Sequence, residues 1–163
     1  MTTLRIRAAH AHDRDLLAQW ALAMALETEH KQLDEATVRA GVEAGIADAA
    51  KARYFIAMHE SAVAGRETIA APAGTLMLTR EWSDWRNGDW WWIQSVYVPE
   101  RFRRMGVFTA LYRHVEQLAR ETPNVVGLRL YVERANANAQ KTYEALGMID
   151  AGYSILEAEF PKA

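Results

Sequence analysis

The chain has 163 residues, which suits one domain (residues 1–163) with room for a substantial hydrophobic core. Half of the residues are apolar and a quarter are charged, and the net charge of −2 (19 basic and 21 acidic residues) gives no general attraction to nucleic acid or anionic membranes. The absence of cysteine excludes disulfides, thiol nucleophiles and cysteine-built zinc sites.

Neither a targeting segment nor a metal-binding pattern is visible in the sequence. The amino-terminal stretch MTTLRIRAAH contains no apolar signal core, and no segment approaches the ~20 apolar residues of a membrane span. We therefore expect a cytoplasmic protein with no membrane partner. No metal site is predicted, because metal-ligand spacing is missing among the histidines His10, His12, His30, His59 and His114.

The first third of the chain predicts a strand followed by two helices. Residues 4–7 alternate between apolar and polar side chains, as in a short strand. Asp13 is placed to cap a first helix and Asp34 to cap a second one. Apolar residues then recur at helical spacing: Leu17, Trp20, Ala21 and Met24 after the first cap, and Val38, Val42 and Ile46 after the second.

The middle of the chain predicts three strands, over residues 54–58, 74–79 and 90–98. The stretch RNGD, residues 86–89, carries turn-forming residues between the last two of them. These two strands are therefore predicted to form a long antiparallel hairpin.

After the hairpin, an amphipathic helix is predicted to begin at Gly106 and to stop before Pro123. Its apolar stripe consists of Val107, Leu111, Val115 and Leu118. A strand over 125–132, a short helix between Asn136 and Gly147, and a last strand over 153–160 follow. The resulting order, β-α-α-β-β-β-α-β-α-β, indicates an α/β layered domain on a mixed sheet.

The stretch RFRRMG, residues 101–106, puts three arginines and a glycine where that amphipathic helix begins. A helix amino terminus carries about half a positive charge and several N–H groups without helical acceptors. Gly106 lets a ligand approach the backbone, so the stretch favours phosphate or pyrophosphate binding. The P-loop and dinucleotide motifs are absent. The alternative interpretation is a solvated basic loop.

Two spaced motifs resemble the GNAT superfamily of N-acetyltransferases, which use acetyl-coenzyme A. The family's phosphate loop, [Q/R]-x-x-G-x-[G/A], is matched by Arg103 and Gly106, whereas Phe108 replaces the small third residue. The later signature N-x-x-A-x-x-x-Y-x-x-x-G-[F/M] is matched at all five positions, by Asn136, Ala139, Tyr143, Gly147 and Met148. The order of the predicted elements fits the family over nearly the whole chain.

The resemblance implies a mixed, mostly antiparallel sheet with helices on both faces, splayed between its fourth and fifth strands. It implies that acetyl-coenzyme A is the cofactor and that its pantetheine arm pairs with the backbone at this splay, like an added strand. The pyrophosphate would be wrapped, largely by backbone N–H groups, by Arg103, Arg104, Met105, Gly106, Val107, Phe108 and Thr109. The arm would meet Val96, Tyr97 and Val98, and also Asn136, Ala139 and Tyr143.

Acyl transfer to an amine needs a neutral amine, a stabilised oxyanion and a proton for the departing thiolate. A phenol with a pKa near 10 stays protonated at neutral pH, so Tyr143 can donate that proton, and the resemblance implies the same role. Periodicity alone would make Tyr143 a core residue. The oxyanion donor would be a backbone N–H near Val96 or Tyr97.

The general base is the least defined part of the predicted site, because strand 90–98 contains no acidic residue. Strict alternation puts Trp90, Trp92, Gln94, Val96 and Val98 on one face, and Trp91, Ile93, Ser95 and Tyr97 on the other. Gln94 can orient an acceptor but cannot take a proton. The candidate bases are carboxylates across the hairpin and at the end of the first helix, namely Glu81, Asp84, Glu27 and Glu29. A chain of water molecules is the other possibility.

Five tryptophans cluster around the predicted hairpin: Trp82, Trp85, Trp90, Trp91 and Trp92. Packing within the core and hairpin is one interpretation. The second is an aromatic wall for a cationic or aromatic acceptor, with Glu81 and Asp84 supplying the counter-charge. The candidate substrate-binding residues are Trp82, Trp92, Gln94 and Glu29. The third is a homodimer interface formed by the hairpin.

The resulting prediction is an acetyl-coenzyme-A-dependent N-acetyltransferase that acts on a small-molecule amine or a peptide amino group. The alternative is a coenzyme-A-binding regulatory or structural module without turnover. A nucleic-acid-binding helix over 101–113 is disfavoured, because acidic residues follow at Glu116 and Glu121 and the chain is net acidic.

Overall fold

In this computed structural model, residues 2–61 and 69–160 are described. They form two compact units, Met1–Leu130 and Tyr131–Ala163, and each is described by itself. Among the described residues, no helix combines the length and the apolar character that crossing a membrane requires.

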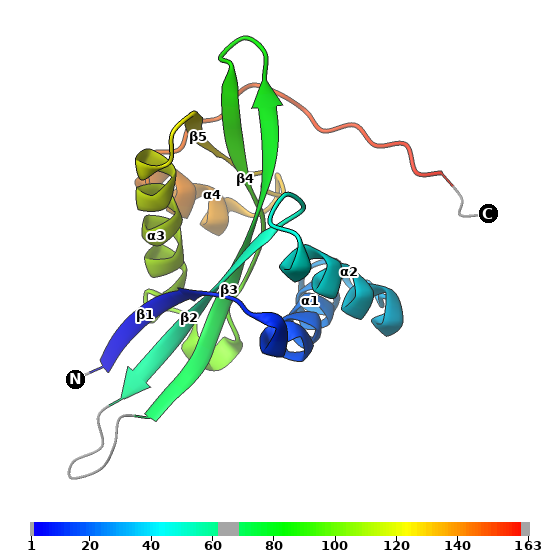
Figure 1. The fold of residues 1–163 in the computed structure, drawn as a ribbon, viewed down its shortest axis with the longest axis vertical. Coiled ribbons are helices and arrows are strands. Elements are labelled where there is room, and N and C mark those ends of the chain that lie inside the picture. The colour runs from blue at the N-terminus through cyan, green and yellow to red at the C-terminus, as the bar shows by residue number, and fades with distance from the viewer. Residues whose placement is uncertain (1, 62–68, 161–163) are drawn as a thin grey trace. The chain divides into compact units, whose positions relative to one another are not determined.

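The first unit is built on a five-stranded sheet with the order β1-β2-β3-β4-β5 (Figure 1). The first four strands pair antiparallel, and β5 joins parallel to β4. This is the mixed, mostly antiparallel sheet that the sequence predicts. The strands are β1 (Thr2–Ala8), β2 (Arg53–Ser61), β3 (Ile69–Ser83), β4 (Gly88–Tyr97) and β5 (Val125–Arg129).

Strands β3 and β4 form the predicted long antiparallel hairpin, paired from Ser83↔Gly88 to Thr75↔Tyr97. The turn that joins them occupies residues 84–87, two positions earlier than the predicted 86–89. Asn87 has φ 43°, the left-handed conformation that asparagine tolerates better than most residues. The tight turn therefore fits the residue found there.

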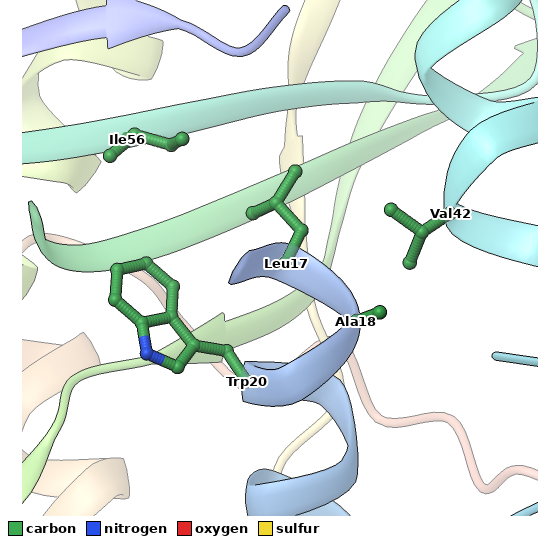
Figure 2. Packing of buried hydrophobic residues seen from close by; sticks show 5 residues of the cluster. All are labelled: Leu17, Ala18, Trp20, Val42 and Ile56. Carbon is green, nitrogen blue, oxygen red and sulfur yellow. The ribbon is translucent and has the colours of Figure 1, made fainter. Parts of the chain in front are cut away.

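Two helices, α1 (Arg14–Glu29) and α2 (Glu35–Ala47), cover one face of the sheet (Figure 1). Their apolar stripes meet β2 in a buried cluster, shown in Figure 2, made of Leu17, Ala18, Trp20, Val42 and Ile56. Four of the five side chains are at most 5% exposed, and Trp20 is 9% exposed. Burial of these stripes stabilises both helices, including α1, whose amino terminus has no side-chain cap.

The opposite face is covered by α3 (Val107–Glu121), so helices lie on both faces as predicted (Figure 1). The buried residues of α3 follow helical spacing: Val107, Leu111, Tyr112, Val115 and Ala119. Gly74 on β3 permits the close approach, because a Cβ there would lie 2.9 Å from Val107 Cγ1 and 3.0 Å from the Tyr97 carbonyl oxygen. Any larger residue at this position would push α3 away from the sheet.

The second unit contains one helix, α4 (Ala137–Ala145), among its described residues. Asn136 caps α4 as predicted, since its Oδ1 accepts the Ala139 N–H at 3.0 Å. Gly147, with φ 92°, follows the end of the helix, and its N–H donates to the Glu144 carbonyl at 2.9 Å. The predicted helix is therefore confirmed at both ends.

The predicted last strand over 153–160 is wrong. These residues are irregular, and their large apolar side chains are exposed: Tyr153, Ile155, Leu156 and Phe160. An alternating pattern forms a strand only where a neighbouring strand takes its hydrogen bonds, and no described strand pairs with this segment.

Asp34 caps α2 as predicted, with the Thr37 N–H donating to its Oδ2 at 2.8 Å, but Asp13 does not cap α1. Asp13 has φ −86° and ψ −5°, whereas a capping residue needs extended backbone. Its side chain, 5% exposed, instead accepts both Arg7 guanidinium nitrogens at 2.7 and 2.8 Å and the His10 N–H at 2.8 Å. The Arg7 hydrogen bonds hold the pKa of Asp13 below its usual value.

We predict that Asp13→Asn lowers the free energy of unfolding by about 2–4 kcal/mol at pH 7, because it leaves a half-buried Arg7 without its charge partner. The folded pKa of Asp13 is lowered. The stabilisation is therefore complete above the unfolded pKa of about 3.9 and is lost as the pH falls through the folded value. Urea unfolding at pH 7 and at pH 3 measures both effects.

Asp15→Asn is the matched control, since Asp15 is an exposed carboxylate two residues further on, in the first turn of α1, and is paired with Arg14 and Arg39. Its effect is expected to be much smaller than that of Asp13→Asn, because solvent screens an exposed ion pair. Equal effects of the two substitutions at pH 7 would contradict the assignment of Asp13 as a stabilising buried partner.

Candidate cofactor and acyl-transfer site

The predicted phosphate loop connects the end of β4 to the start of α3. A short 3-10 helix (Glu100–Phe102) precedes the loop, and Phe102, 8% exposed, anchors it in the core. Arg104 has φ 63° and Gly106 has φ 77°, so the backbone turns through two left-handed residues before α3 begins. Such turns direct backbone N–H groups into a common concavity that suits an anion.

The amino terminus of α3 is open to a ligand. No side chain caps it, and the first helical bond runs from the Ala110 N–H to the Gly106 carbonyl at 2.9 Å. A Cβ built on Gly106 would meet no described atom within 4 Å, so the backbone there is accessible. Arg104 is exposed and adds positive charge beside this opening. The loop therefore fits the predicted pyrophosphate.

The side chain of Arg103 points elsewhere. Its Nη2 forms an ion pair with the Glu27 carboxylate of α1, and its Nε donates to the Val98 carbonyl at 3.0 Å. The Tyr97 hydroxyl donates to the other oxygen of Glu27 at 2.8 Å. The sequence places Glu27 only among candidate bases. No spacing signal joins it to residues 70 or more positions away.

The predicted splay lies between β4 and β5. Their parallel pairing runs from Asp89↔Val125 to Trp92↔Arg129, where β5 ends three residues before the predicted Val132. Strand β4 continues to Tyr97, paired only with β3 among the described strands. The last part of β4, including Val96, therefore presents a backbone edge that leads toward the phosphate loop.

A β-bulge at Gln94 changes which side chains share a face. Met77 pairs with Ser95 and Leu78 with Ile93, so Gln94 is the extra residue. Tyr97 therefore lies on the same face as Trp92, and the strict alternation predicted for 90–98 is wrong beyond Ile93. On this face the Gln94 amide donates to Thr79 Oγ1 at 2.9 Å.

The candidate base Glu81 lies beside the start of the splay but is held in a salt bridge. Its carboxylate accepts the Trp92 indole N–H and pairs with Arg129 at 2.8 Å. These contacts, of which the Trp92 hydrogen bond has the largest effect, lower the pKa of Glu81 and make it a weaker base. Arg129 was not predicted as a site residue. Only its place in the strand after the phosphate-loop helix could have signalled it.

The other two candidate bases, Asp84 and Glu29, are placed less favourably than Glu81. Asp84 lies in the hairpin turn, where its Oδ1 accepts a hydrogen bond from the Trp85 N–H. The turn is separated from Trp92 by about 13 Å or more along the hairpin. Glu29, at the end of α1, pairs with Lys31 at 2.6 Å. Neither carboxylate faces the start of the splay in the way Glu81 does.

The hairpin tryptophans do not form one wall. Trp91 is buried at 3% exposure, whereas Trp82 and Trp85 are 63% and 85% exposed. Trp82 pairs with Asp89, so it faces away from Glu81 and Trp92, which lie on the other side of the sheet. Trp90 packs under the Arg129 guanidinium, 4.1 Å from its ring centroid.

In the second unit, Tyr143 lies half-buried on α4, one helical turn beyond Ala139. Burial raises the pKa of its hydroxyl above the usual value of 10. Tyr143 therefore holds its proton throughout the neutral pH range, as a proton donor to a thiolate must.

Comparison with known proteins gives a family match across most of the chain. The family model for "Acetyltransferase (GNAT) family" matches residues 16–148. A search of curated protein sequences finds no match.

Among solved structures, a possible acetyltransferase from Clostridium difficile 630 is 38% identical, with a TM-score of 0.85, over 98% of this chain and 99% of that one. A probable acetyltransferase is 25% identical, with a TM-score of 0.77, over 98% and 99% of the two chains. A ribosomal-protein-alanine N-acetyltransferase from Brucella melitensis biovar Abortus 2308 shares the fold at 19% identity, with a TM-score of 0.69, over 97% of this chain and 100% of that one. The chain belongs to the GNAT family of acetyltransferases.

Proposed function

We propose that the chain transfers an acetyl group from acetyl-coenzyme A to a primary amine of a small molecule or peptide, by direct attack in a ternary complex. The observation that carries the proposal is the uncapped amino terminus of α3 at the end of the splayed edge of β4. A pyrophosphate position followed by an open strand edge suits a ligand that has a pyrophosphate and an extended amide-containing arm.

When bound, the cofactor supplies a thioester-activated acetyl group. The backbone N–H groups from Arg104 to Thr109 bind its pyrophosphate, with Phe108 within the first turn of α3. The backbone of Val96, Tyr97 and Val98 orients the arm, and an N–H near Val96 or Tyr97 stabilises the oxyanion.

On α4 and at its cap, Asn136, Ala139 and Tyr143 keep the cofactor-binding roles that the family signature implies. Tyr143 donates a proton to the departing sulfur, which its raised pKa supports. A water chain deprotonates the amine in this proposal, because the hydrogen bonds from Trp92 and Tyr97, together with the arginine pairs, lower the pKa of Glu81 and Glu27. Gln94 and Trp92 lie on the face where the acceptor is expected.

Two neighbours in fold support an amine acceptor. One neighbour is an aminoglycoside acetyltransferase in complex with sisomicin, at 13% identity and a TM-score of 0.69, and another is the ribosomal-protein-alanine N-acetyltransferase. Small-molecule and peptide amines are both kept in the proposal for this reason. A cytoplasmic location, a possible homodimer and the absence of a nucleic-acid partner also belong to it as predictions from the sequence.

The second candidate function is a coenzyme-A-binding module without turnover. The salt bridge of Glu81 with Arg129 favours it, because this carboxylate, which lies beside the start of the splay, is then a poor proton acceptor. Acetylation of any amine in a screen would exclude it.

We expect calorimetric titration with acetyl-coenzyme A to show micromolar affinity that depends on the pantetheine arm. Desulfo-coenzyme A should bind with similar affinity, and adenosine diphosphate more weakly. Absence of binding by acetyl-coenzyme A would remove the cofactor site and with it the proposed reaction.

Gly106→Asp is predicted to weaken coenzyme A binding by about 100-fold or more, because a carboxylate would face the pyrophosphate. Gly106→Asn is the matched control. Asparagine carries the same strain at φ 77° without the charge, so it should bind at least about tenfold more tightly than the aspartate variant. Equal affinities for the two variants would point to strain alone.

Tyr143→Phe is predicted to lower kcat by about 100-fold and to change coenzyme A affinity little, since only the proton donor is removed. Steady-state kinetics and calorimetry measure the two quantities. Tyr153→Phe, at an 81% exposed tyrosine of the same unit, should change neither. Unchanged kcat in the Tyr143 variant would exclude this residue as the proton donor.

A further inference from the structure

Three elements of the first unit meet at one carboxylate, that of Glu27. One oxygen accepts the Tyr97 hydroxyl of β4 at 2.8 Å, and the other pairs with the Arg103 guanidinium of the phosphate loop. Arg103 also reaches the Val98 carbonyl through Nε at 3.0 Å. The last full turn of α1, the end of the splayed strand and the start of the loop are therefore tied together.

The contacts use both sides of the Arg103 guanidinium. Nη2 faces Glu27 and Nε faces the carbonyl of Val98, the residue after β4, so the side chain lies back toward the end of the strand that leads into the loop. The Glu27 hydrogen bond, more than any other cause, raises the pKa of Arg103, and the negative charge of Glu100 raises it by a smaller amount. The pair is formally neutral, which keeps the Glu27 charge from opposing an anion at the adjacent loop.

Tyr97 reaches Glu27 only because of the bulge at Gln94. The bulge brings Tyr97 to the face covered by α1, where its ring packs against Trp20 with centroids 6.1 Å apart. Burial of the ring and the bond to Glu27 raise the pKa of its hydroxyl, so it stays a donor. The carboxylate is thereby held by two donors from different elements.

We propose that Glu27 is a positioning residue for the cofactor site. It holds the Arg103 side chain on the end of β4, so that the loop presents its backbone N–H groups, rather than the arginine, to the pyrophosphate. The inference rests on the proposed function and adds a role for Glu27, Tyr97 and the Arg103 side chain that the family motif does not contain.

If the Arg103 side chain bound the pyrophosphate itself, removal of the Glu27 charge would change coenzyme A affinity in the opposite direction. If Arg103 left Glu27 and paired with the pyrophosphate, Glu27 would compete with the cofactor. Removal of the Glu27 charge would then tighten coenzyme A binding. If Glu27 positions the loop, the same substitution weakens binding.

The test is a double-mutant cycle on coenzyme A affinity, measured by calorimetry for the wild type, Glu27→Gln, Arg103→Gln and the double variant. Each single substitution is expected to weaken binding about five- to tenfold. The double variant should be no weaker than the worse single variant, because both substitutions break the same contact. Glu27→Asp, which keeps the charge, should recover part of the lost affinity.

Two readouts separate positioning from a general loss of stability. The KM for acetyl-coenzyme A should rise with kcat little changed, and thermal unfolding should shift no more than in the control cycle of Glu60→Gln and Arg5→Gln. That control removes an inter-strand pair of 2.8 Å on β1 and β2, and it should leave coenzyme A affinity unchanged.

Unchanged or tighter binding by Glu27→Gln would overturn the inference and leave the proposed function intact. Additive losses in the double variant would also overturn it, since they would mean that Arg103 and Glu27 act separately. A wild-type protein that does not bind coenzyme A would overturn the proposed function itself, and the inference with it.

Discussion

The structure of the first unit depends on where the parallel pairing of β4 and β5 stops. The two strands pair as far as Trp92 and Arg129, and β5 ends there while β4 runs on to Tyr97. The edge of β4 beyond this point has backbone groups that need a partner. In the proposed reaction the partner is the extended arm of the cofactor, and the amino terminus of α3 lies where that edge meets the loop.

Two carboxylates near this edge are each paired with an arginine. Glu81 pairs with Arg129 and Glu27 pairs with Arg103, and both have a lowered pKa. Paired carboxylates order their surroundings more readily than they accept protons. The same charges that make poor bases thus hold the strands and the phosphate loop in place, while the raised pKa of Tyr143 keeps the one proposed acid protonated.

Local signals predicted much of the fold, because they act over a few residues. The caps at Asp34 and Asn136 and the apolar stripe of α3 depend on residues about one helical turn apart. The hairpin from β3 to β4 depends on the short turn that joins its strands. Asp13 failed as a cap because Arg7, on the preceding strand, takes its carboxylate. The last strand failed because alternation cannot show whether a pairing strand is present.

By itself, the sequence determined the element order through β5 and α4, the loop with Gly106, and the membership of the GNAT family that the motifs indicated. These depend on residue identity and short spacing. The tertiary structure alone decided the face that Tyr97 occupies, the neutralisation of Glu81 and the joining of Glu27 to Arg103. The reason is physical: a single bulge at Gln94 reverses the side chains that follow it, and ion pairs across 48 or 76 residues leave no periodic signal in the chain.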